Sequence, residues 1–376
     1  MIENAWGYLL SIATIAAFFG ILERRSNARL FEYLPAVVLI YAAAMLLSQS
    51  GFWIKNDAVN AAYATAKGNL LPAMLFLMML QVDLRHFAKL GRSLLIAYAA
   101  AVLSLAAAFV AVFRLFGFGP DEAGLFAALC GSWMGGTANM LAVGAALGVS
   151  ENMMGFAFVT DAVNYTFWVV LLLALVRAAP GFNRWSGAVA SHEALSDLGC
   201  ACNIGPKRYW QLILISLLIA WLCQWLAPLL GLLGTTTWTV LLATLFGLAA
   251  SYTPLSRFRG SGEIASTMLL LLVALIGSRA DFAGWESVPY YLLAGFAILL
   301  LHGAVMVASA KLFRLDLFSI GVASLANIGG VASAPILAAA YDRSLVGIAV
   351  LMAVMGYLIG TFGGLAVGYT LLRIAP

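Results

Sequence analysis

Charged residues are scarce in this sequence. Lys, Arg, Asp and Glu make up only 10% of its 376 residues, whereas 64% of the residues are hydrophobic. No basic patch with interleaved aromatic residues is present, so the composition argues against nucleic acid as a partner. Many apolar runs are long enough to cross a bilayer. The sequence therefore predicts an all-α, polytopic membrane protein with the lipid bilayer around it.

Residues that hold metals or act as nucleophiles are few and scattered. The three histidines are His86, His192 and His302, and no His-x-x-x-His or Glu-x-x-His pattern occurs. Cys200 and Cys202 share a loop, but this pair alone is a weak sign of a metal site. The sequence therefore predicts no catalytic residue, no metal and no cofactor, and it argues against an intramembrane enzyme. His302 lies inside an apolar run, where it either hydrogen-bonds a neighbouring helix or carries protons.

The apolar runs form two sets with the same plan. A first transmembrane repeat is predicted over residues 1–176 and a second over 209–376, joined by a polar stretch at 177–208 that is read as a cytosolic linker. The runs are 5–22, 32–50, 66–82, 93–115, 121–148, 152–176, 209–230, 236–252, 263–278, 288–310, 316–340 and 344–372.

Two of these runs are interrupted by glycines and polar side chains. Residues 131–139 read Gly-Ser-Trp-Met-Gly-Gly-Thr-Ala-Asn, and residues 325–333 read Leu-Ala-Asn-Ile-Gly-Gly-Val-Ala-Ser. Non-helical backbone at membrane depth is tolerated only where protein or a water-filled cavity surrounds it. Paired interruptions in two halves of a membrane chain are a pointer to a transporter's binding site.

The basic residues indicate how these interrupted runs meet the membrane. If each dips into the bilayer and returns, the chain has ten crossings, and 15 of the 20 Lys and Arg residues lie in cytosolic loops. If both cross fully, the basic residues divide 8 to 12, so the re-entrant arrangement fits the positive-inside rule better. The predicted cytosolic residues are Arg24, Arg25, Arg29, Arg85, Lys89, Arg92, Arg177, Arg184, Lys207, Arg208, Arg257, Arg259, Lys311, Arg314 and Arg343. Five crossings per repeat make the second repeat inverted, with both termini of the chain outside.

The two tips are the predicted substrate site. Helix N-termini that converge at the midplane offer N–H groups to an anion, and Asn139 and Ser333 are expected to cap these helices, with Pro335 in the first turn of the second. The predicted substrate-binding residues are Ser132, Gly135, Gly136, Thr137, Asn139, Asn327, Gly329, Gly330 and Ser333.

Asp161 is the predicted ion-coupling residue, together with Thr160 and Asn164. It lies about ten residues into the run 152–176. An unpaired ionised carboxylate there costs at least ~2.5 kcal/mol, so it is expected to carry a proton, to bind Na⁺ or to hold helices together through hydrogen bonds. Glycines in Gly131-x3-Gly135 and Gly360-x3-Gly364-x3-Gly368 also fit close helix packing.

No Lys or Arg lies well inside an apolar run, since Lys67 and Arg114 fall at run ends. A dianion usually meets an arginine clamp, so we expect a small organic anion or zwitterion that is moved with Na⁺ or H⁺ by a secondary transporter. One alternative is a cation/proton antiporter in which Asp161 and Asn164 bind the cation. Another is a membrane receptor or assembly factor that transports nothing.

The tip at 131–139 and the sequence Thr-Asp-Ala-Val-Asn-Tyr at 160–165 resemble the YjcL-like family of bacterial membrane proteins, defined by domain of unknown function 819. The plan is more distantly similar to inverted-repeat elevator carriers, such as the sodium/glutamate and sodium/citrate symporters, whose re-entrant hairpins hold substrate and sodium. That resemblance implies an oligomer in the bacterial inner membrane with a static scaffold, for which the runs 32–50 and 236–252 are candidates. This chain lacks the basic residue that those carriers place beside the second tip.

Overall fold

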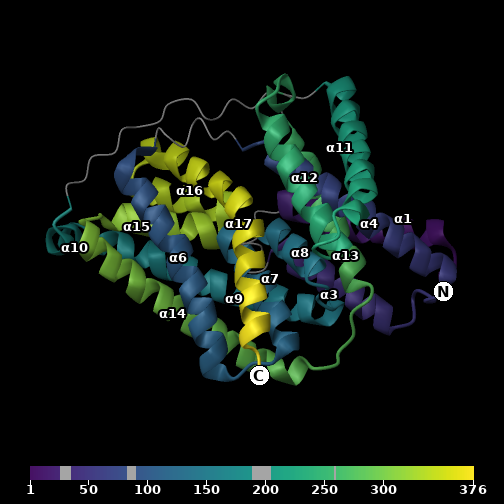
Figure 1. The fold of residues 1–376 in the computed structure, drawn as a ribbon, viewed down its shortest axis with the longest axis horizontal. Coiled ribbons are helices and arrows are strands. Elements are labelled where there is room, and N and C mark those ends of the chain that lie inside the picture. The colour runs from purple at the N-terminus through teal and green to yellow at the C-terminus, as the bar shows by residue number, and fades with distance from the viewer. Residues whose placement is uncertain (26–34, 83–89, 189–204, 258–259) are drawn as a thin grey trace. The chain divides into compact units, whose positions relative to one another are not determined.

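The computed structural model describes residues 1–25, 35–82, 90–188, 205–257 and 260–376 (Figure 1). It is built of helices, and an isolated parallel β-bridge joins Ile2 to Trp53. A helix occupies each predicted apolar run, and both interrupted runs are divided into two helices. The helices are α1 (Ala5–Arg25), α3 (Ala36–Gln49), α4 (Asp57–Met79), α6 (Gly91–Phe116), α7 (Pro120–Gly135), α8 (Thr137–Ala146), α9 (Glu151–Leu175), α10 (Ala179–Ser186), α11 (Pro206–Leu226), α12 (Thr235–Ser251), α13 (Ser261–Gly277), α14 (Val288–Phe313), α15 (Leu317–Ile328), α16 (Gly330–Tyr341) and α17 (Val346–Ile374).

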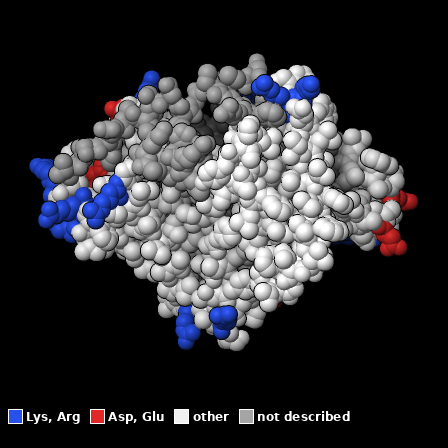
Figure 2. Space-filling model, turned by 45° about the horizontal axis from the view of Figure 1, so that its top comes forward, with Lys and Arg blue, Asp and Glu red and all other residues white. Residues whose placement is uncertain are grey.

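Helical segments of membrane-spanning length recur along the chain. Within the described residues, six are long and apolar enough to cross a bilayer. They are Ala5–Arg25, Gly91–Phe116, Glu151–Ser186, Pro206–Leu229, Trp285–Phe313 and Arg343–Ile374. Uncharged residues make up most of the face shown in Figure 2. Such lengths and such a surface define a polytopic membrane protein, as predicted.

The chain divides into two compact units, each built from both halves of the sequence. Unit 1 comprises Met1–Gln81, Gly144–Ala162 and Asn203–Val288, and it contains α1, α3 and α4 together with α11, α12 and α13. Unit 2 comprises Val82–Val143, Val163–Cys202 and Pro289–Pro376, and it contains α6, α7, α10, α15, α16 and α17. The boundaries fall within α8 and α9 and at the start of α14, so the first three helices of each half gather in unit 1.

In unit 1, α4 carries a lysine in its interior. Asn56 caps α4 by accepting the Val59 N–H at 2.9 Å, so the helix begins well before the predicted run and Lys67 lies near its middle. The Lys67 ammonium lies 3.0 Å from a Glu151 carboxylate oxygen that also accepts the Tyr63 hydroxyl at 2.5 Å. These side chains are partly exposed, so the ion pair is a modest link between α4 and the start of α9.

In unit 2, α17 packs closely against α7 through glycine. A Cβ atom at Gly135 would collide with the carbonyl oxygen of Gly356, and one at Gly360 would lie 2.8 Å from the Gly135 Cα. One turn along, a Cβ atom at Gly364 would lie 2.9 Å from the Gly131 Cα. The packing role predicted for the α17 glycines is confirmed at Gly360 and Gly364, because only glycine permits such an approach of two helices.

Candidate functional site

The first interrupted run is a helical hairpin. The chain breaks at Gly136, which has φ +90° and open space around its Cα, between α7 and α8. A Cβ atom on Gly131 would lie 3.0 Å from the Asn139 carbonyl oxygen and 2.9 Å from the Val143 side chain. In an unbroken helix residues 131 and 143 would be about 18 Å apart, so α8 folds back along α7.

The second interrupted run is also a hairpin. Gly330 has φ +59° and is the first residue of α16, two residues after α15 ends at Ile328. A Cβ atom on Gly321 would lie 3.6 Å from the Leu337 side chain, and the rings of Phe318 and Tyr341 are 5.4 Å apart. The start of α15 therefore meets the end of α16, and the hairpin returns to the level at which it began.

The α9 and α14 helices run parallel to each other and give unit 2 two distinguishable ends. A Cβ atom on Gly295 would lie 2.5 Å from the Asn164 amide nitrogen, and further along both helices the rings of Trp168 and His302 are 5.8 Å apart. Residues later in α9 therefore contact residues later in α14, so the two helices run in the same direction and their N-termini lie at the same end of unit 2.

The two hairpins begin at opposite ends of α14. Tyr290 and Tyr291, at the N-terminus of α14, donate to the Phe116 carbonyl (3.0 Å) and the Glu122 carboxylate (3.4 Å), which places the start of α7 at this end. At the other end of α14, Lys311 is followed within six residues by the start of α15. The first hairpin thus opens toward one end of unit 2 and the second toward the other.

Both tips lie beside the middles of long helices. A Cβ atom on Gly329 would lie 2.6 Å from the Tyr165 ring, and Tyr165 is about the midpoint of α9. The first tip contacts α17 at Gly356 and Gly360, again near the middle of the helix. Since α9 and α17 are each long enough to span a bilayer, the tips fall near half of that span.

At the first tip, Asn139 ties the hairpin to α17. Its amide nitrogen donates to the Gly135 carbonyl at 2.7 Å and approaches the Gly356 carbonyl at 3.5 Å, and its amide oxygen accepts the Thr361 hydroxyl at 2.5 Å. The prediction that Asn139 caps α8 was wrong, because α8 begins at Thr137 and Asn139 is already inside it. The side chain is 2% exposed, and all its hydrogen-bonding atoms are engaged within the protein.

At the second tip, two buried oxygen atoms have no hydrogen-bond partner. They are Oδ1 of Asn327 and Oγ of Ser333, whose residues are 0% and 1% exposed. The Asn327 amide nitrogen donates to the Ala323 carbonyl at 2.8 Å. Each such buried polar atom costs about 1 to 3 kcal/mol when it is left unpaired, so a bound polar ligand at this tip would recover that free energy.

The helix after the second tip begins earlier than predicted. Gly329, and not Ser333, is the N-cap residue of α16, and Pro335 lies in the second turn and not the first. Because proline has no N–H, the carbonyl of Val331 lacks its usual helical donor. A free carbonyl thus adds an acceptor within one turn of Ser333.

The remaining predicted residues occupy the helices around the tips. Ser132 is buried within α7, and Thr137 is the first residue of α8. Thr160 and Asn164 are completely buried in α9, and Asp161 between them is half-buried. The ion-coupling candidates therefore share one helix with Tyr165, which contacts the second tip.

His302 lies in a chain of hydrogen bonds that links α6, α9, α14 and α15. The Trp168 N–H can only donate, so it donates to Ser324 Oγ at 2.9 Å, and Ser324 donates to His302 Nε2 at 2.8 Å. His302 Nδ1 then donates to Ser104 Oγ at 2.7 Å, and Ser104 donates to the Ala101 carbonyl at 2.9 Å. A neutral imidazole satisfies every atom of this chain, which favours the helix-linking interpretation of His302 over proton transport.

Some contributors to the site could not be found from the sequence. Thr361 and Gly356 hold Asn139 from more than 200 residues away, and only their place in an apolar run with regularly spaced glycines hints at a packed face. Within the described residues, no group of three or more His, Cys, Asp and Glu side chains is placed to hold a metal ion. Cys200, Cys202, His86 and His192 lie outside the described residues.

The fold defines an all-helical, polytopic membrane protein. Residues 10–374 match the family described as "Protein of unknown function (DUF819)", and the chain belongs to that family. It is 26% identical over 397 residues to the "Uncharacterized membrane protein YjcL" of Bacillus subtilis (strain 168), which covers 96% of this chain and 95% of that protein. The family resemblance predicted from residues 131–139 and 160–165 is confirmed.

Proposed function

We propose that this protein is a secondary active transporter of the bacterial inner membrane that moves a small organic anion or zwitterion together with Na⁺ or H⁺. The observation that carries the proposal is the pair of hairpins in unit 2, which open toward opposite ends and place their tips beside the middles of α9 and α17. Tips of this kind allow a ligand at the midplane to be reached from either side.

The second tip has the chemistry for such a ligand. The first N–H groups of α16 have no partner within the helix and favour an anionic group. Asn327 Oδ1 can only accept, so it suits an ammonium group or a cation, whereas Ser333 Oγ can donate or accept. Donors and acceptors side by side fit a zwitterion, or an anion bound together with Na⁺.

The division into units supports a transporter with a static scaffold. The scaffold candidates 32–50 and 236–252 correspond to α3 and α12, which both belong to unit 1, whereas both tips belong to unit 2. We propose ten membrane crossings in two inverted repeats, re-entrant hairpins, termini outside, and a homo-oligomer formed through the scaffold.

Uptake into proteoliposomes tests this function. Wild-type protein, Asp161→Asn and empty liposomes are compared for labelled small carboxylates and amino acids under an imposed Na⁺ or pH gradient. We expect gradient-driven accumulation by the wild type and none by Asp161→Asn, with both proteins eluting as the same folded species. Normal coupled uptake by the variant would remove Asp161 from the coupling role.

The antiporter alternative predicts another outcome of the same experiment. Asp161 and the buried Asn164 lie three residues apart on α9, and together they offer side-chain oxygens of the kind that bind a cation. An antiporter would exchange Na⁺ for H⁺ across the liposome membrane with no solute accumulation. Loss of that exchange in Asp161→Asn would then assign the cation site to Asp161, and the proposal of an organic substrate would be abandoned.

A further inference from the structure

A short amphipathic helix lies where two membrane-spanning helices of unit 2 end. The α9 helix ends at Leu175 and leads through a 3₁₀ turn, Val176–Ala178, into α10. The C-terminal part of α14 reaches the same place, because Lys311 Nζ donates to the Trp185 carbonyl at 2.5 Å. Since both helices are of spanning length, α10 is placed at the level where apolar chains give way to headgroups.

The α10 helix is fixed to the rest of unit 2. Lys311 also lies 5.1 Å from the centre of the Trp185 ring, a cation–π arrangement at the helix C-terminus where a positive charge is favourable. Asn183 accepts the N–H of Leu317, the first residue of α15, at 2.9 Å. The helix is therefore a docked element of the hairpin-bearing unit.

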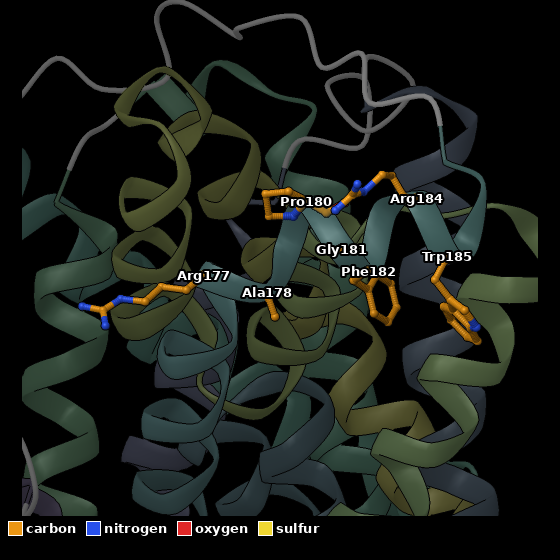
Figure 3. A pocket seen from close by; sticks show the side chains of 7 residues that line it. All are labelled: Arg177, Ala178, Pro180, Gly181, Phe182, Arg184 and Trp185. Carbon is orange, nitrogen blue, oxygen red and sulfur yellow. The ribbon is translucent and has the colours of Figure 1, made fainter.

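An open pocket of about 660 Å³ lies against α10 and is lined by Arg177, Ala178, Pro180, Gly181, Phe182, Arg184 and Trp185 (Figure 3). In Figure 3 the rings of Phe182 and Trp185 point to one side of the helix, whereas the guanidinium of Arg184 lies on the other. Partly exposed aromatic rings on one side of a short helix, with an arginine on the other, are typical of a helix at a membrane interface.

The charge of this pocket has one sign. Arg177 and Arg184 are exposed, and no described residue forms an ion pair with either of them. Arg184 Nε donates to the Pro180 carbonyl at 3.3 Å, which leaves its terminal amino groups for another acceptor. Asp316, which precedes Leu317 in the chain, is buried, accepts the Ser319 N–H and does not line the pocket.

We propose that this pocket binds the phosphate headgroup of an anionic phospholipid from the surrounding bilayer. The Arg184 guanidinium supplies N–H donors to the phosphate oxygens, while Phe182 and Trp185 contact the glycerol and the upper acyl chains. Arg177, whose guanidinium extends away from Arg184 in Figure 3, adds positive charge at the other end of the pocket. The pocket volume lies within the range of sites for molecules of headgroup size. Through Asn183 and Leu317, the bound lipid would also steady the start of the second hairpin.

Native mass spectrometry of the full chain, with graded additions of phosphatidylglycerol or phosphatidylcholine, tests this inference. The Arg177→Gln/Arg184→Gln variant is compared with Arg114→Gln/Arg373→Gln, which removes two exposed arginines from the ends of α6 and α17. We expect the wild type and the control to prefer phosphatidylglycerol about tenfold, and the first variant to prefer it less than twofold. Arg177→Lys/Arg184→Lys, which keeps the charge but loses the paired donors, is expected to fall between them.

An unchanged preference in the Arg177→Gln/Arg184→Gln variant would overturn the proposal, as would equal losses in both double variants. Inorganic phosphate at the lipid concentration serves as a third arm. If it occupies the wild-type protein as well as phosphatidylglycerol does, the pocket is a site for a free anion and not for a lipid. Thermal midpoints of all variants in the same detergent confirm that each remains folded.

Discussion

The two hairpin tips have similar sequences but differ in how their polar atoms are used. At the first tip, the Asn139 amide is engaged by Gly135, Gly356 and Thr361, so the tip is fastened to α17. At the second tip, Asn327 Oδ1 and Ser333 Oγ are buried without partners, and Pro335 frees a carbonyl nearby. The difference indicates that the first hairpin is held by the protein alone, whereas the second has polar atoms left for a ligand.

The largest effect is expected where the first tip meets α17. Gly135→Ala would drive a methyl group into the Gly356 carbonyl, and backbone facing backbone has little room to relax. We expect a loss of at least ~3 kcal/mol in the free energy of unfolding, seen as a lowered thermal midpoint or no folded protein. Gly136→Ala is the matched control.

Gly136 has φ +90° and ψ 173°, a backbone conformation that is essentially restricted to glycine, but a Cβ atom there would meet no neighbour, so its substitution costs only this backbone strain, about 1 to 3 kcal/mol. Equal losses at the two neighbouring glycines would contradict the close contact with α17.

The two asparagines should also differ in stability. Asn139→Ala removes the acceptor of the buried Thr361 hydroxyl, and we expect a loss of about 2 to 3 kcal/mol. Asn327→Ala removes one hydrogen bond but also an unpaired buried oxygen, so a loss of no more than ~1 kcal/mol is expected. Thermal unfolding of both variants in detergent checks this order, and a reversed order would mean that the first tip is not the fastened one.

A serine at the second tip should affect ligand binding more than folding. In Ser333→Ala an unpaired hydroxyl is lost, so the thermal midpoint without solute should match the wild type or rise. Its increase in the presence of a bound solute should disappear. Ser324→Ala breaks the His302 chain and is the control: it should cost about 1 to 3 kcal/mol but keep the solute response. If the solute raises the thermal midpoint of Ser333→Ala as much as that of the wild type, the ligand does not bind at this tip.

The smallest effect is expected at the base of the second hairpin. The Asp342 carboxylate accepts the Ser344 N–H at 2.8 Å, which lowers the pKa of this carboxyl below its usual value. A lowered folded-state pKa means that the carboxylate stabilises the fold above the pKa of the unfolded chain, and that this contribution is lost as the pH falls through the folded-state pKa. Asp342→Asn should flatten the acid side of the stability profile slightly, because the side chain is fully exposed. A profile identical to that of the wild type would assign no role to this turn.

Sequence patterns predicted the helices and their two breaks because apolar length and glycine pairs act locally. Gly136 and Gly330 take the positive φ that ends one helix and begins the next, and this requirement is visible in the sequence. The predicted capping roles of Asn139 and Ser333 were wrong, because α8 starts at Thr137, directly after Gly136, and α16 starts at Gly330, so both side chains lie inside their helices. The Asn139 amide oxygen instead accepts a hydrogen bond from Thr361, 222 residues away, and no local sequence pattern predicts such a contact.

The polar stretch between the two repeats also contains structure that the sequence analysis did not predict. The polar composition of residues 177–208 predicts a loop, yet Ala179–Ser186 form α10, with Pro180 in its first turn and Gly187 at φ +76° after its end. Proline at the start and glycine past the end are signals of a helix that the sequence did contain. Its docking through Lys311 and Asn183 depends on tertiary structure and could not be predicted. The assignment of scaffold and substrate site stays a prediction.

The most direct test of a solute site at the tips is the thermal stability of the purified protein in Na⁺ against choline, at two pH values, with a panel of small carboxylates and amino acids. We expect a particular solute to raise the thermal midpoint only when Na⁺ is present, or only at the lower pH. A rise of the midpoint with Na⁺ alone, and no further change with any solute, would favour the antiporter. No response to any solute or cation would contradict the proposed transporter.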